Sequence, residues 1–107
     1  MANRKEQIRK IVLDILFERE VTRWKPTQFE NLAVGVAEVI ENRESGGKNQ
    51  TAGGFSSQLG SADKMILQEV FWDLFVNKII TLGMNEANPG YPWFRLHSEA
   101  EQNINRT

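Results

Sequence analysis

The sequence contains no cysteine and a single histidine, His97. These scarcities exclude disulfides and zinc sites built from thiolates, and they leave no group of imidazoles to hold a metal ion. A triad of serine, histidine and carboxylate would have to form around His97, which has no evident partner in the sequence. We therefore expect no catalytic residues, no metal site and no cofactor, and a protein that is not an enzyme.

Long apolar runs are also missing. No stretch approaches the roughly 20 apolar residues that cross a membrane, and the charged start MANRKEQIRK does not have the pattern of a signal peptide. This favours a cytoplasmic protein without a membrane partner. The chain has 107 residues, of which 40% are apolar and 25% charged, as expected for one globular domain.

The charges nearly balance, with a formal net charge of −1, but they are unevenly distributed. Residues 1–25 hold seven Lys or Arg against four acids, whereas residues 61–107 hold four bases against six acids. A basic end is a natural place for a polyanion to bind. It is also an ordinary property of a solvated helix surface.

Three stretches carry apolar residues at helical spacing. We predict helices from Asn3 to Glu20, from Thr27 to Arg43 after a capping-box pattern, and from Ala62 to Lys78 with Ser61 as the cap. The predicted core residues are Ile8, Ile11, Val12, Ile15, Leu16, Phe29, Leu32, Ala33, Val36, Ala37, Ile40, Ile66, Val70, Phe71, Leu74 and Phe75, with Met65, Trp72 and Val76 at the margins of the third stripe. The Gly- and Ser-rich stretch 44–60 predicts a flexible loop.

The stretch ITLGMNEANPGYPWFRLH, residues 80–97, has two short apolar runs on either side of a polar tip. It predicts a β-hairpin with Ile80 and Leu82 on one strand and Trp93, Phe94 and Leu96 on the other. Because an isolated hairpin is marginal in water, we expect it to cover the open side of the helical core, with its tip projecting. The polar tail, residues 98–107, is predicted to fray.

This order of elements resembles the bacterial winged helix-turn-helix family of DNA-binding domains. The more specific part of the resemblance comprises Trp72 and Leu74 at the end of the third helix, Asn88, Pro89 and Gly90 in the loop, and Pro92, Phe94, Arg95 and Leu96 after it. His97 stands where we expect threonine, and loop 44–60 replaces a tight turn. The resemblance implies a mainly α, three-helix winged domain with a small β-hairpin over residues 1–97.

In this family the third helix enters the major groove and the wing, here residues 84–93, contacts the DNA backbone or minor groove. The resemblance therefore implies a transcriptional regulator, or the DNA-binding module of a larger system, that binds double-stranded DNA as a dimer. The candidate DNA-binding residues are Ser61, Lys64 and Gln68 on the third helix, Asn88, Tyr91 and Arg95 in the wing, and Arg23 and Lys25 in support.

The charge of the predicted third helix favours an alternative. Three acids and two bases lie between Ser61 and Lys78, and carboxylates repel phosphates. A winged helix of this kind would contact another protein or a second copy through the apolar margin of the third helix, or through Phe55 and Leu59. If the chain binds DNA, its affinity for DNA should fall steeply as the salt concentration rises. If it contacts a protein, it should form a stable complex and show no salt-sensitive binding to DNA. Trp24, Trp72 and Trp93 are expected in the core.

Overall fold

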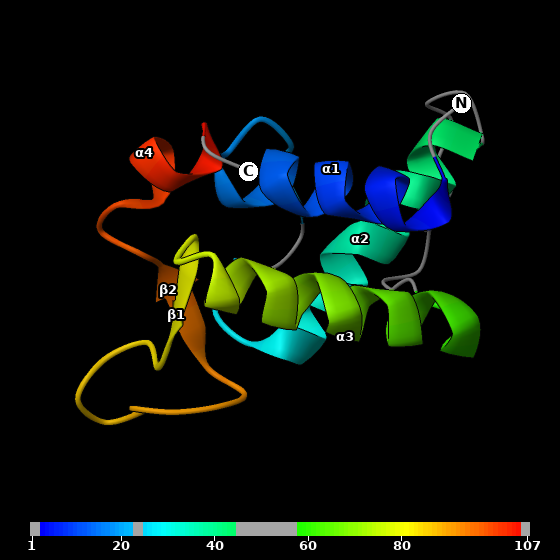
Figure 1. Cartoon of the computed structure of the whole chain (residues 1–107). Helices are drawn as coiled ribbons and strands as arrows, with labels where there is room; N and C mark the ends of the chain where they lie inside the picture. Colours follow the sequence, from blue (N-terminus) through cyan, green and yellow to red (C-terminus); the bar gives the residue numbers. More distant parts are fainter. Residues whose placement is uncertain (1–2, 23–24, 45–57, 106–107) are drawn as a thin grey trace.

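The computed structural model describes residues 3–22, 25–44 and 58–105, which form a mainly helical fold with one antiparallel pair of strands (Figure 1). The elements are helices α1 Arg4–Leu16, α2 Phe29–Glu44, α3 Ser61–Val76 and α4 Ala100–Ile104, and strands β1 Ile80–Leu82 and β2 Phe94–Leu96. Helices α1 and α3 run side by side, and the hairpin follows the C-terminal end of α3 (Figure 1). The predicted succession of three helices and a hairpin is confirmed.

Some predictions fall on residues that the structure does not describe. Arg23, Trp24 and most of the predicted loop 44–60, including Phe55, lie outside the described residues. Among the helices that are described, none has both the length and the apolar character needed to span a membrane.

Helix α1 is shorter than predicted. It stops at Leu16 rather than at Glu20, because Glu18 adopts a left-handed φ of 62° and the chain then turns back. The N–H of Arg19 donates to the carbonyl of Asp14 at 2.7 Å, which satisfies one of the acceptors left free at the helix end. The sequence has no glycine at the end of α1, so the helical spacing of apolar residues predicted a helix that is too long.

Residues 27–29 pair with the second half of the hairpin. The N–H of Phe94 donates to the carbonyl of Thr27, and the N–H of Phe29 donates to the carbonyl of Pro92, each at 3.0 Å. Helix α2 therefore begins at Phe29 and not at Thr27 as the capping-box pattern predicted. This extended segment ties the start of α2 to a part of the chain more than sixty residues away.

Helix α3 is displaced by one or two residues from its predicted bounds. Gly60, and not Ser61, is the N-cap residue, and no side chain donates to or accepts from the cap. The helix ends at Val76 rather than at Lys78, because Lys78 has a left-handed φ of 58°. The left-handed residue redirects the backbone from the helix into β1.

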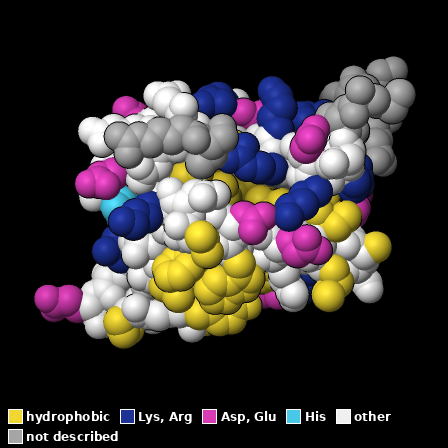
Figure 2. Space-filling model, viewed as in Figure 1, with side chains coloured by type: hydrophobic (Ala, Val, Ile, Leu, Met, Phe, Trp, Pro, Cys, Tyr) yellow, Lys and Arg dark blue, Asp and Glu magenta, His cyan; other side chains and the backbone are white. Residues whose placement is uncertain are grey.

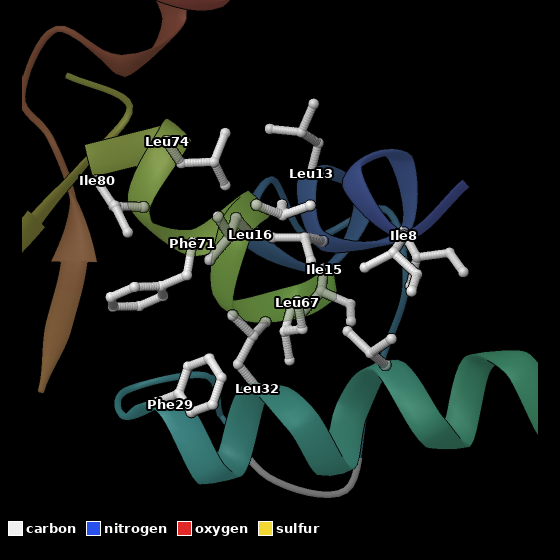
Figure 3. Packing of buried hydrophobic residues seen from close by; sticks show 14 of the residues in the cluster. Ile8, Leu13, Ile15, Leu16, Phe29, Leu32, Leu67, Phe71, Leu74 and Ile80 are labelled. Atoms are coloured by element: carbon white, nitrogen blue, oxygen red, sulfur yellow. The ribbon is translucent and has the colours of Figure 1, made fainter. Parts of the chain in front are cut away.

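The core lies between the three long helices and the hairpin. The Phe71 ring occupies its centre, with centroids 5.4 Å from Phe29 and 5.2 Å from Phe94, both in edge-to-face contact. Figure 3 shows Phe29, Leu32, Leu67 and Phe71 converging from α2 and α3. Phe94 and Ile80 are buried, so the hairpin covers this core as predicted.

The buried stripe of α3 is rotated from the one predicted. Leu67, which the prediction omitted, is fully buried, and Phe75, which it included, is partly exposed. The buried set Leu67, Val70, Phe71 and Leu74 follows the spacing of a single helix face. Because α3 carries apolar residues on most sides, its sequence does not identify the buried one.

The C-terminal tail is helical from Ala100 to Ile104, which corrects the expectation that it frays. Ala100 and Asn103 are buried, and the Asn103 side-chain amide donates to the carbonyl of Lys78 at 2.9 Å. That carbonyl belongs to the turn between α3 and β1, so α4 holds this turn in place. The polar composition of the tail concealed the contact.

The hairpin loop folds closely over one glycine. Ile80 pairs with Leu96, and the N–H of Gly83 donates to the carbonyl of Trp93 at 2.7 Å. Gly83 has a φ of 87°, and a Cβ at this position would collide with the carbonyl of Pro89. A residue with a side chain would therefore strain the backbone and displace the loop.

Candidate functional site

The residues predicted to read DNA from α3 lie in different settings. Ser61 and Gln68 are exposed, whereas Lys64 is partly buried. The ammonium of Lys64 lies 2.8 Å from the Glu30 carboxylate on α2. The cation that we expected to bind phosphate from α3 is therefore engaged with an acid of the same molecule.

The acids of α3 are paired with bases of α1. Arg4 binds Asp63 at 2.7 Å, and the ammonium of Lys5 lies 2.9 Å from Asp73 and 3.3 Å from Glu69. The hydrogen bond to Asp73 is the main cause of a raised pKa at Lys5, and the bond to Arg4 lowers the pKa of Asp63. We call these five residues the α1–α3 ion-pair seam. Two bases of the basic N-terminal end thus pair with the three carboxylates of α3 that would repel DNA.

The candidate residues of the wing mainly serve the loop itself. The Arg95 guanidinium donates to the carbonyl of Gly83 at 2.8 Å, across the mouth of the hairpin. The N–H of Asn88 donates to the side-chain oxygen of Asn85 at 2.9 Å, which stabilises the turn. Arg95 and Lys25 are exposed, and Arg23 lies outside the described residues.

Five exposed apolar side chains lie on α3 and on the adjacent hairpin loop. They are Met65 at 61% exposure, Trp72 at 43%, Phe75 at 37% and Val76 at 74%, joined by Tyr91 from the hairpin loop at 53%. We call this set the α3 apolar face. It takes the place of the polar or basic side chains that a helix in the major groove presents to base edges.

The α3 apolar face is organised around a stacked aromatic pair. The rings of Trp72 and Tyr91 lie 5.7 Å apart at 21°, and Phe75 meets Trp72 edge to face at 5.8 Å. Tyr91 also contacts the buried ring of Phe71 at 6.1 Å. Contact with the core thus restricts the exposed rings, so they would lose little conformational entropy when a partner binds them.

Figure 2 shows the hydrophobic side chains collected over the C-terminal half of α3, bordered by acidic and basic side chains on the side of α1. With usual side-chain areas, the five residues expose roughly 500 Å² of largely apolar surface. The largest apolar patch on a typical monomer is about 300–600 Å² and is often functional. The α3 apolar face is therefore the strongest candidate for a functional surface among the described residues.

The sequence predicted only part of the α3 apolar face. Met65, Trp72 and Val76 were predicted at the margin of the buried stripe, but Trp72 was also expected in the core and Phe75 within the stripe. Tyr91 was interpreted as a hydrogen-bonding residue of the wing. Helical spacing can place the first three on one side of α3, but only the folded hairpin brings Tyr91 to them.

No protein-family model, curated protein or solved structure matches this chain. Within residues 3–22, 25–44 and 58–105, no three histidine or carboxylate side chains gather in a group suited to a metal ion. The function of this chain must therefore be inferred from its own surface and its own side-chain contacts.

Proposed function

We propose that this chain is a protein-interaction module on a winged-helix framework, and that the α3 apolar face is its contact surface. The observation that carries the proposal is the exposed Trp72–Tyr91 stack, with Phe75 packed against Trp72 and with Met65 and Val76 exposed on the same helix. Interface centres are enriched in aromatic residues and methionine and depleted in charge. The α3 apolar face has this composition.

The arrangement of the elements supports the winged-helix framework. Three helices enclose the core, a hairpin covers it, and residues 27–29 add a third extended segment beside β2. This arrangement supports the winged-helix interpretation of the run from Trp72 to Leu96.

The ion pairs support protein contact over DNA. A protein that binds phosphates uses Lys and Arg side chains to displace counterions. Here Lys64 is bound to Glu30, and Lys5 is bound to Asp73 and Glu69. Binding of DNA through α3 would have to break these pairs while placing Met65, Trp72 and Val76 against polar base edges.

A photo-crosslinking experiment tests the contact surface directly. A benzophenone amino acid replaces Val76 or Met65 in the chain expressed in cells, and irradiation traps whatever touches that position. Val21 is the matched control, because it is 95% exposed and lies outside the face, between α1 and α2. We expect adducts from positions 76 and 65 and none from position 21. No adduct from either face position, or equal adducts from all three, would contradict the proposal.

A mobility-shift assay on random duplex DNA at two salt concentrations separates the two functions. We expect no salt-sensitive shift for the wild type. A shift that weakens with salt, and that both Lys64→Glu and Arg95→Glu abolish, would instead establish the DNA-binding function predicted by the family resemblance.

A further inference from the structure

We infer that the α3 apolar face binds a second copy of this chain, forming a closed two-fold dimer. This inference rests on the proposed function and names its partner. The area of the face, the charges at its borders and the exposed amide of Gln68 support it.

The exposed area matches what a small dimer requires. A standard interface buries about 800 Å² on each partner, and in homodimers about 65% of that area is apolar. The apolar share is therefore about 500 Å², close to the roughly 500 Å² that the face exposes. Two copies of the face thus supply the apolar part of such an interface without a further element.

The borders of the face also tolerate their own copy. In a two-fold interface the same patch occurs on both subunits, so a charge close to the axis meets its own copy and is repelled by it. On the side toward α1, Glu69 and Asp73 are paired with Lys5. On the side toward α2, Lys64 is paired with Glu30. Each border therefore presents charges of both signs: the border toward α2 is balanced, and the border toward α1 has one ammonium for two carboxylates.

Gln68 is a polar group suited to this arrangement. It is exposed on α3 one turn before Trp72 and so lies beside the apolar side chains. A glutamine amide both donates and accepts hydrogen bonds, and its own copy is a complementary partner across a two-fold axis.

Sedimentation equilibrium of the purified full chain over a wide range of concentration tests the inference. We expect a monomer–dimer equilibrium that ends at twice 12.3 kDa. Val76→Glu and Met65→Glu each place a charge in the contact and are expected to raise the dissociation constant about tenfold or more. Val21→Glu, the same change at the exposed control position, is expected to leave it unchanged.

Circular dichroism of each variant establishes that it is folded. Three results would overturn the inference: a wild type that stays monomeric at the highest concentration, association that continues beyond two copies, or equal weakening by Val21→Glu and Val76→Glu.

Crosslinking separates this inference from the proposed function. Two copies with different tags are expressed together, one of them carrying the benzophenone at position 65 or at position 76. An adduct that contains both tags supports the dimer. An adduct with another protein leaves the interaction function standing and refutes the second copy as the partner, whereas no adduct from positions 65 and 76 refutes both.

Discussion

At Asp63 one carboxylate combines two favourable interactions. It binds Arg4 at 2.7 Å, and it lies in the first turn of α3, where the helix dipole favours an anion. Arg4 lowers its pKa below the usual 3.8, so its contribution to stability is present above that pH and is lost as the pH falls through the lower value of the folded state.

We predict that Asp63→Asn destabilises the domain by about 0.5 kcal/mol at pH 7, because both groups of the pair are partly exposed. The difference from the wild type should shrink as the pH falls below 3.8 and through the lowered pKa of Asp63 in the folded state. Urea unfolding over a series of pH values from 7 downward measures this. Glu86→Gln, at an exposed acid of the hairpin loop, is the control; a difference that persists in acid would show that the pair is not responsible.

Gly83 is the residue whose backbone most requires the absence of a side chain. Its φ of 87° and the adjacent Pro89 carbonyl lead us to predict that Gly83→Ala costs about 1–3 kcal/mol in the free energy of unfolding. Gly90→Ala in the same loop, where an added Cβ meets no atom within 4 Å, should change it by less than about 0.5 kcal/mol. Equal effects in denaturant unfolding would contradict the close packing at Gly83.

At the scale of the element, the two sides of α3 provide a direct comparison. Leu67→Ala removes a fully buried side chain and should cost about 2–5 kcal/mol. Phe75→Ala removes a larger side chain, but one that is partly exposed, and should cost less than Leu67→Ala. Thermal or denaturant unfolding of the two variants measures which one loses more stability. The reverse order would favour the stripe predicted from the sequence over the observed one.

The sequence predicted the elements better than their ends. Helical spacing and the alternation in residues 80–97 depend on local interactions, which is why three helices and a hairpin were anticipated. The ends of α1 and α3 depend on left-handed Glu18 and Lys78, two residue types that give no warning of such a conformation. The start of α2 depends on pairing with the distant Phe94, which no local pattern reveals.

The candidate surface was predicted less well than the fold, for a similar reason. The partners of Lys64 and Lys5 lie on other helices, and the stack of Trp72 with Tyr91 joins a helix to a loop. Charge counts along the chain record how many acids and bases there are, but not which ones neutralise each other. The decisive contacts are all between residues far apart in the sequence.

At the scale of the whole molecule, a dimer links stability to concentration. If unfolding separates the two copies, the melting temperature should rise by about 3 °C for each tenfold increase in protein concentration. Differential scanning calorimetry at several concentrations measures the slope. Val76→Glu should flatten it and Val21→Glu should preserve it; a flat slope for the wild type would count against the second copy.

The position of Tyr91 also sets an order of events during synthesis. Tyr91 follows Trp72 by nineteen residues, so the ribosome releases α3 before the ring that completes its outer surface. A nascent chain that carries α3 alone has exposed apolar residues but not the stacked rings, and it gains the finished shape only when the hairpin has emerged and closed. Association of two chains should therefore follow the folding of each one and not precede it.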